Sequence, residues 1–222
     1  MNVFIDIETI PDQADGVLDK FISEVSAPGQ YKKPESIVQW IADNAKSEGD
    51  QQWLKTSFDG ARGQICCICY AIEDGPIRKF SVNGDADELL LLRAFDFSLC
   101  EDLNLRGETM RPHFIGHYIK GFDLPFLFKR MVINQVRPNF KFTPFGRHGS
   151  DFYDTMEAWE GFKGSISLVN LASALGFNAK ADMSGADVWP AFKNGEYDKI
   201  ASYCADDVEA VRKVYNKINF IK

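Results

Sequence analysis

The sequence predicts an α/β fold in which helices flank a mixed β-sheet. Strand patterns occur near the start of the chain, helical patterns then alternate with one further strand, and the last helical segment carries an apolar stripe. The chain has 222 residues, which is enough to bury a sizeable core. We expect one domain over residues 1–222, with a helical insertion at about 11–63.

Four segments have the composition of β-strands. Residues 3–9 are rich in β-branched side chains and alternate with a period of two. Residues 64–72 and 77–82 are apolar runs, and the sequence Glu73-Asp-Gly-Pro76 between them is a turn signal. A short strand is expected at 113–116. These segments predict the sheet.

Helical patterns surround the strands. Residues 16–25 and 35–45 have helical spacing, and loop signals that include Pro28 and Pro34 separate them, so we expect the insertion to be helical. Further helices are expected over residues 86–97, 123–132, 166–175 and 197–218. The last of these has an apolar face formed by Ile200, Cys204, Val208, Val211, Tyr215 and Ile218.

Charge and targeting signals narrow the classes of partner. With 25 basic and 32 acidic residues the net charge is −7, which argues against a protein that coats nucleic acid through a broad basic face. The argument is weaker for an enzyme whose bound divalent cations face the phosphate. The first residues lack the basic segment of a signal peptide, and no apolar run is long enough to span a bilayer. We expect cytoplasmic residence and no membrane partner.

The five cysteines raise the question of a zinc site. Cys66, Cys67 and Cys69 lie together in an expected strand, whereas Cys100 and Cys204 are isolated in the sequence. Zinc sites normally use pairs of ligands at two-to-four-residue spacing, with a second pair elsewhere. Because that second pair is missing, we interpret these residues as reduced, buried thiols, with zinc ligation as the alternative.

The first candidate for chemistry is a pair of acids on the first strand. Asp6 and Glu8 are two residues apart, so they point to the same face with about 6.6 Å of rise between them. Phe4 shares this face. Two acids among apolar residues are costly unless they are neutralised, and a bound cation would do so. The alternative is an edge strand whose acids are solvated.

Two further acidic signals follow. Asp123 comes after a strand and a turn, at the start of a helix, where it binds a cation or acts as a helix N-cap worth about 1 kcal/mol. Tyr203 and Asp207 are four residues apart on the last helix and share one face. Asp206 points roughly 100° away around the helix axis. Each signal alone also occurs without any catalytic role.

In this order the segments Asp6-Ile-Glu8-Thr9, Phe122-Asp123 and Tyr203-x-x-x-Asp207 resemble the three exonuclease motifs of the DEDD superfamily, which has a ribonuclease-H-like fold. Tyr203 resembles the DEDDy branch, because the other branch has histidine at this place. The chain looks most like the stand-alone 3′–5′ exonucleases related to the proofreading domain of family B DNA polymerases. This resemblance covers nearly the whole chain except about 11–63.

The resemblance implies a mechanism and a set of ligands. Two ions, Mg²⁺ or Mn²⁺, would be held by Asp6, Glu8, Asp123 and Asp207. Asp6 would bridge both ions, Glu8 and Asp207 would complete the site of the attacking water, and Asp123 would support the second ion. A free tyrosine titrates near pKa ~10, so Tyr203 is expected to orient the nucleophile rather than take its proton.

The implied activity is release of nucleotides from a 3′ end, with single-stranded DNA favoured and RNA as the alternative substrate. A silent binding module and a structure-specific endonuclease are the competing functions. The family's second motif usually has asparagine where this chain has Tyr118, so contact with the terminal nucleotide is expected to differ. Three weaker candidates remain. Arg147 and His148 are candidates for a phosphate contact from their loop, and Asp154 is a candidate helix cap. Tyr118 and Phe122 are candidates for stacking on a base.

Overall fold

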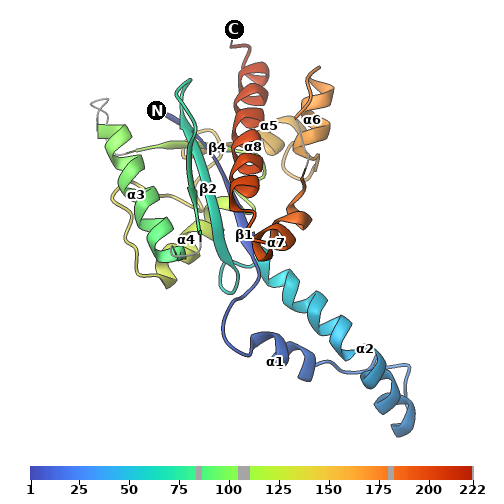
Figure 1. Cartoon of the computed structure of the whole chain (residues 1–222). Coiled ribbons are helices and arrows are strands. Elements are labelled where there is room, and N and C mark those ends of the chain that lie inside the picture. Colours follow the sequence, from blue (N-terminus) through green and yellow to red (C-terminus); the bar gives the residue numbers. More distant parts are fainter. Residues whose placement is uncertain (84–86, 105–110, 180–182, 222) are drawn as a thin grey trace.

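A computed structural model describes residues 1–83, 87–104, 111–179 and 183–221. Its centre is a mixed sheet with the strand order β3-β2-β1-β4-β5 (Figure 1). The first three strands in this order pair antiparallel, and β1, β4 and β5 pair parallel. The strands are β1 (Asn2–Ile10), β2 (Gln64–Ile72), β3 (Arg78–Ser81), β4 (His113–Gly116) and β5 (Phe152–Asp154). The predicted α/β architecture with a mixed sheet is confirmed.

Strand β1 lies in the middle of the sheet, so the edge-strand alternative for its acids is wrong. Its antiparallel register with β2 places Asp6 opposite Cys69 and Glu8 opposite Cys67. The pairing shifts between Glu8 and Thr9, where the strand bulges. Neighbouring strands pair with both edges of β1 and helices cover both of its faces, so Glu8 is buried and Asp6 is partly buried.

Helices cover both faces of the sheet (Figure 1). One face packs against α3 (Glu88–Asn104) and α4 (Asp123–Ile133) through Ile5, Ile7 and their neighbours. The other face packs against α7 (Gly185–Lys193) and α8 (Tyr197–Ile218). Two shorter helices, α5 (Thr155–Glu160) and α6 (Leu168–Ala174), lie beside α8. None of the helices in the described residues is long and apolar enough to cross a membrane.

The stripe on α8 explains how this helix reaches the sheet. Ile200, Cys204, Val208 and Val211 are buried as predicted, and Val214 joins them. Tyr215 packs at the edge of the same cluster with its ring 5.5 Å from that of Phe4. The apolar face of α8 therefore lies on β1 and β2. This packing places the residues that flank the apolar stripe next to the sheet.

A buried ion pair holds α4 against α3. The Arg130 guanidinium donates to both Glu88 oxygens at 2.9 and 2.6 Å, and the Ile65 amide also donates to Glu88 at 2.7 Å. Both charged side chains are less than a tenth exposed. Removal of one partner would leave an uncompensated buried charge. This pair therefore fixes α4, and with it the position of Asp123 at the helix start.

The segment between β1 and β2 forms a helical arm, which we define as residues 11–63. It contains α1 (Val17–Ser23), α2 (Pro34–Leu54) and a short 3-10 helix, η1 (Lys55–Phe58), and it extends away from the sheet (Figure 1). Helix α2 runs nine residues beyond the predicted end at 45. A Cβ at Gly49 would lie 2.7 Å from the Ile22 backbone, so glycine here allows α1 to pack closely on α2.

Four elements were not predicted from the sequence: η1, β5, α5 and α7. Strand β5 has only three residues, too few for a visible alternation. Helix α7 contains Pro190, a residue that normally interrupts helices, but a capping box between Ser184 and Asp187 stabilises its start. Helix α3 begins at Glu88 and extends past the predicted end at 97, and residue 86 of the predicted helix lies outside the described residues.

Candidate active site

Asp6 and Glu8 project from β1 toward the face that α8 covers. Phe4 and Ile10, on the same side of the strand, pack in the apolar cluster that contains the α8 stripe. Glu8 is 8% exposed, and Asp6 retains only partial exposure. The Oδ2 atom of Asp6 is itself buried and has no hydrogen-bond partner among the described residues. A buried carboxylate oxygen without a donor indicates a missing positive ligand.

Asp123 approaches β1 from α4, the helix that packs on the opposite face of the sheet from α8. It is the first residue of α4, with Phe122 at the N-cap position, and its side chain is 5% exposed. Asp123 Oδ1 accepts a hydrogen bond of 3.2 Å from the backbone amide of Ile7, which lies between the two acids of β1. The N-cap alternative for Asp123 is wrong, because its carboxylate contacts the central strand.

Asp207 and Tyr203 approach from α8. The two residues are one helical turn apart and both are partly buried, whereas Asp206 is exposed. Burial raises the pKa of Tyr203 well above its ordinary value of 10, and the charges of Asp207 and Glu8 raise it further. Asp206 was predicted to point to a different side of the helix from Tyr203 and Asp207, and its exposure agrees with this prediction.

The four carboxylates repel one another. Burial, and then repulsion from Glu8, Asp123 and Asp207, raises the pKa of Asp6 well above its usual value. Burial, followed by the charge of Asp207, raises the pKa of Glu8 in the same way. Burial raises the pKa of Asp123 to about 7 and that of Asp207 to about 6. The contact of Asp123 with the Ile7 amide, and that of Cys204 on α8 with the Asp6 carbonyl, bring the three segments that carry these acids together.

This cluster has the donor set of a hard cation site. Among the described residues, none of the four acids forms an ion pair with a lysine or arginine. Ligand atoms of Asp6, Glu8 and Cys204 lie within 4.8 Å of one another. Mg²⁺ and Mn²⁺ prefer carboxylate oxygens, and a divalent cation would offset the repulsion and supply the partner that Asp6 Oδ2 lacks.

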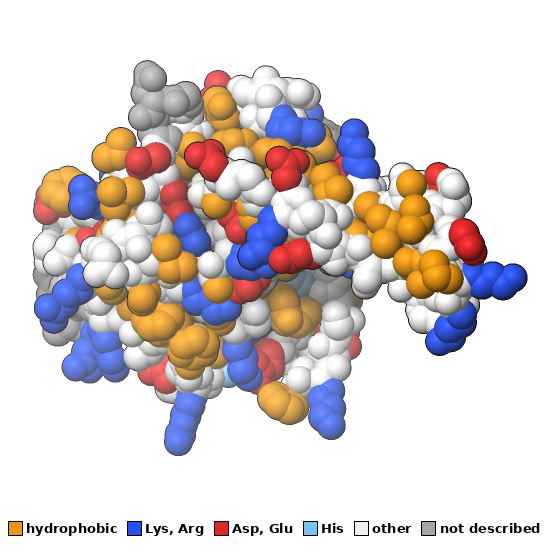
Figure 2. Space-filling model, turned by 90° about the horizontal axis from the view of Figure 1, so that it is seen from below, with side chains coloured by type: hydrophobic (Ala, Val, Ile, Leu, Met, Phe, Trp, Pro, Cys, Tyr) orange, Lys and Arg blue, Asp and Glu red, His pale blue; other side chains and the backbone are white. Residues whose placement is uncertain are grey.

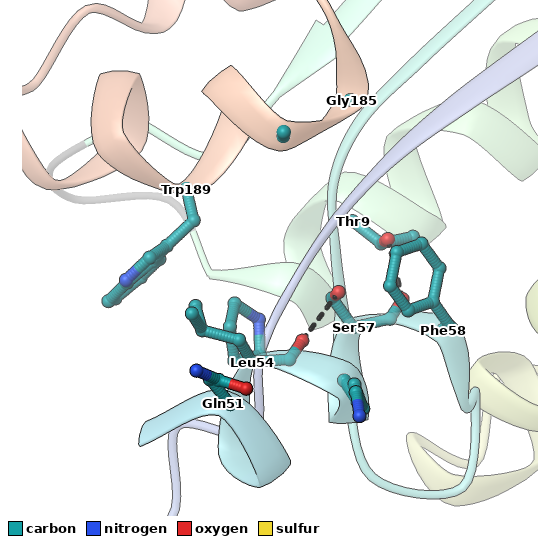
Figure 3. A pocket seen from close by; sticks show the side chains of 10 residues that line it. Thr9, Gln51, Leu54, Ser57, Phe58, Gly185 and Trp189 are labelled. Atoms are coloured by element: carbon teal, nitrogen blue, oxygen red, sulfur yellow. Dashed lines mark hydrogen bonds between the residues drawn. The ribbon is translucent and has the colours of Figure 1, made fainter. Parts of the chain in front are cut away.

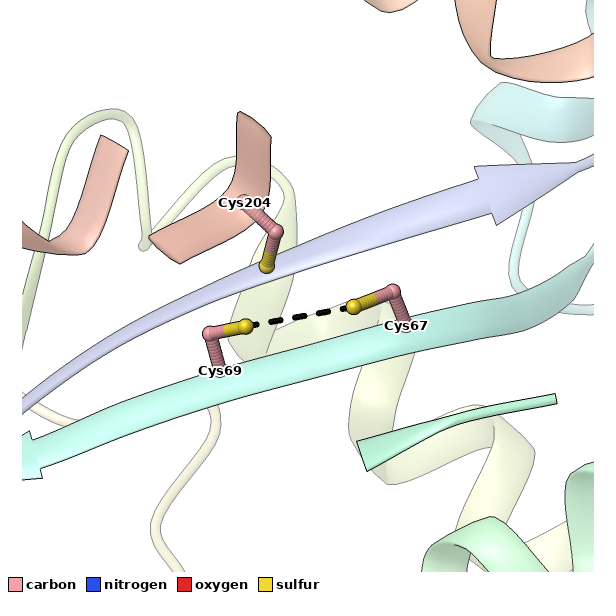
Figure 4. A group of neighbouring side chains, drawn as sticks. All are labelled: Cys67, Cys69 and Cys204. Atoms are coloured by element: carbon pink, nitrogen blue, oxygen red, sulfur yellow. Dashed lines mark hydrogen bonds between the residues drawn. The ribbon is translucent and has the colours of Figure 1, made fainter. Parts of the chain in front are cut away.

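Three cysteines from β2 and α8 lie close together (Figure 4), and one of them, Cys204, is also grouped with Asp6 and Glu8. The sulfur atoms of Cys67, Cys69 and Cys204 are within 4.8 Å of one another, and the Cys204 thiol donates to the Asp6 carbonyl at 3.3 Å. All five cysteines are buried and free, as predicted, but the assumption that Cys204 is isolated is wrong. Thiolates are soft ligands, so these sulfurs suit zinc or copper(I) rather than Mg²⁺.

Tyr118 is the residue at which the second motif departs from the family pattern. It has a positive φ of 58° and is half exposed, and its amide donates to Asp154 Oδ1 at 3.0 Å. Its ring lies over Gly121, where a Cβ would be 2.3 Å from a ring atom. The turn before Asp123 therefore presents an aromatic face to solvent.

The remaining candidates have structural partners. Asp154 caps α5 by accepting from the amides of Met156 and Glu157, as expected for a cap. His117 Nε2 donates to the Ile166 carbonyl at 2.8 Å. His148 Nε2 donates to the backbone oxygen of Asp154 at 3.1 Å and its ring lies 5.0 Å from that of Tyr153. Arg147 is exposed in its loop.

Comparison with known proteins extends this description. No curated protein matches the chain. A family model described as a predicted 3′–5′ exonuclease related to the exonuclease domain of PolB matches residues 65–222, more than half of the chain. The matched part includes Asp123, Tyr203 and Asp207, and β1 with its two acids precedes it. The ribonuclease-H-like fold expected from the resemblance is confirmed. The chain therefore belongs to the family of predicted 3′–5′ exonucleases related to the exonuclease domain of PolB.

Proposed function

We propose that this protein is a divalent-metal-dependent 3′–5′ exonuclease that releases nucleotides from the 3′ end of single-stranded DNA by two-metal phosphodiester hydrolysis. The observation that carries this proposal is the cluster of Asp6, Glu8, Asp123 and Asp207, in which four acids repel one another and none forms an ion pair within the described residues. Such a cluster lowers stability unless it binds cations, so a purely structural role does not account for it.

Each acid has a role that follows from its position. Asp6, whose buried Oδ2 has no hydrogen-bond partner among the described residues, would be a ligand of the ions. Glu8 and Asp207 would hold the ion that carries the attacking water, and Asp123, anchored to the Ile7 amide, would hold the second. A pair of Mg²⁺ or Mn²⁺ ions supplies a nucleophile at neutral pH and stabilises charge on the attacking and leaving oxygens.

Tyr203 acts by orientation rather than by proton transfer. Burial, together with neighbouring negative charge, raises the pKa of its hydroxyl above 10, so the phenol stays protonated at neutral pH. A protonated phenol can hold a water or a phosphate oxygen by hydrogen bonding but cannot accept its proton. A Tyr203→Phe variant should therefore lose activity without a change in the pH dependence of the remaining rate.

The test is digestion of oligonucleotides labelled at one end, with and without a blocked 3′ terminus, in Mn²⁺. Wild-type protein should shorten free 3′ ends stepwise and leave blocked ends and closed circles intact. Asp6→Asn and Asp207→Asn should abolish this activity, and the exposed neighbour Asp206→Asn is the matched control that should retain it. Cut circles would favour a structure-specific endonuclease, and binding without any digestion would favour a silent module. Matched RNA tests the preference for DNA.

A further inference from the structure

A groove runs along the junction between the helical arm and α7 (Figure 3). Its first part has a volume of about 300 Å³ and includes Thr9, the residue that follows Glu8. An adjoining pocket of about 450 Å³ shares Leu54, Ala186 and Trp189 with it. The two pockets together form a continuous groove, and Thr9 connects it along β1 to Glu8, the preceding residue.

We propose that this groove binds the bases of the unpaired strand close to the bond that is cut. The inference rests on the proposed nuclease function and adds a binding surface to it. The arm precedes the part of the chain that the family model matches, so the arm wall of the groove is a feature of this chain rather than of the matched segment. The walls, the charge and the rigidity of the groove each support this assignment.

The walls of the groove suit flat apolar rings. Phe58 on the arm and Trp189 on α7 lie on opposite sides, with Leu54 between them (Figure 3). Phe58 is 73% exposed, so its ring is accessible to a ligand in the groove. Nucleobases stack on aromatic side chains whatever their identity. Gln51 is the one side-chain amide in this lining, so little discrimination between bases is expected.

The charge of the groove suits a phosphate backbone. Lys55 lines the part near Thr9, and Lys193 lines the adjoining part, where Asp50 is the acidic residue. Neither lysine forms an ion pair within the described residues, and Lys193 lies 5.4 Å from the Trp189 ring centroid. The protein has a net charge of −7, so two lysines without ion pairs in an aromatic groove stand out. They favour a ligand that combines negative phosphates with aromatic bases, as a nucleic acid strand does.

The base of the arm is fixed to the body, so the groove exists before any ligand binds. The Thr9 hydroxyl of β1 donates to the Ser57 carbonyl of the arm at 2.7 Å, and within the arm the Trp53 indole donates to the Asp12 carbonyl at 2.8 Å. The Trp53 ring also packs edge-on against Trp189 with 5.2 Å between their centroids. A preformed groove loses little conformational entropy on binding, which favours affinity.

Unpaired bases fit this groove better than a duplex does. In double-stranded DNA the bases are stacked inside the helix, and only their edges are accessible in the grooves. A pocket with aromatic walls contacts the faces of bases, which only an unstacked strand presents. Seen from below, the arm stands out from the body, and hydrophobic, basic and acidic side chains are interspersed on this side (Figure 2).

The test measures binding by fluorescence anisotropy, with Ca²⁺ in place of the catalytic ion, for one labelled oligonucleotide as a single strand and as a duplex. Phe58→Ala should weaken single-strand binding by about five- to a hundredfold, the effect of one lost stacking contact. Lys55→Ala should weaken it and reduce its salt dependence. The matched controls are Phe220→Ala and Lys32→Ala, an exposed aromatic outside the groove and an exposed arm lysine, and both should bind as the wild type does.

Stabilisation by Mn²⁺, measured as the rise in melting temperature, separates this inference from the proposed nuclease function. Phe58→Ala should show the same rise as the wild type, because the acids bind the ion and the groove contacts the bases. Unchanged single-strand binding in Phe58→Ala and Lys55→Ala, or equal losses for the duplex, would overturn the groove assignment even if the wild type digests DNA. Weaker single-strand binding in both variants, from a protein that digests nothing, would support the groove and refute the nuclease.

Discussion

The substitution Asp123→Asn should make the metal-free protein less sensitive to alkaline pH. Burial raises the pKa of Asp123 to about 7 in the folded protein, against 3.8 for an unperturbed aspartate. A raised carboxyl pKa means that the folded state favours the protonated form. Its contribution to stability is therefore greatest below about pH 4 and is lost as the pH rises toward 7, above which the deficit is constant.

The magnitude follows from the pKa shift. Between pH 5 and pH 8 the folded carboxyl passes through its pKa of about 7, while the unfolded one is already ionised. Two pKa units at about 1.4 kcal/mol each give a loss of about 3 kcal/mol over this range in the wild type. Asparagine stays neutral, and its Oδ1 atom can still accept from the Ile7 amide. Any packing cost of the new amide group is independent of pH and cancels in the comparison.

Urea denaturation in EDTA at pH 5 and pH 8 measures this effect. The wild type should lose about 3 kcal/mol more than Asp123→Asn between the two pH values. Asp154→Asn is a control at a buried carboxylate that accepts from the amides of Tyr118, Lys120 and Met156. The substitution Asp154→Asn should destabilise the protein by about 1–3 kcal/mol, because the new side-chain NH2 group would face a backbone N–H that now donates to the carboxylate. Equal losses in the wild type and in Asp123→Asn would refute the argument from burial.

Three other predictions concern the cation site, α4 and the arm. Mn²⁺ at about 100 times its Kd should stabilise the wild type by about 2.7 kcal/mol in a thermal melt, and a melting temperature indifferent to millimolar Mn²⁺ would contradict the site. Arg130→Ala should lower the free energy of unfolding by about 3–5 kcal/mol because Glu88 stays buried without its partner, and a loss below about 1 kcal/mol would show that the pair is dispensable. Gly49→Ala should cost about 1–3 kcal/mol and expose the arm to proteases, because the new Cβ would meet the Ile22 backbone at 2.7 Å; unchanged proteolysis would show that α1 can shift freely.

Local periodicity was sufficient for much of the fold. The alternation along residues 3–9 predicted that Asp6 and Glu8 share a face, and the spacing on the last helix predicted its buried stripe. Both inferences depend on backbone geometry within a few residues, which the sequence determines directly. Short elements such as β5 lack enough residues for such a pattern, and the proline in α7 concealed a helix that capping and packing stabilise.

The neighbours of each side chain were decided by the tertiary structure alone. Asp123 had two local interpretations, cap or ligand, and only the packing of α4 on the sheet brought its carboxylate to the Ile7 amide. Cys204 was isolated in the sequence, and the docking of α8 placed it against Cys67 and Cys69. Phe58 carried no sequence signal, because its meaning depends on Trp189, more than a hundred residues away. Contacts of this kind follow from strand order and close packing across the whole chain, which no local pattern encodes.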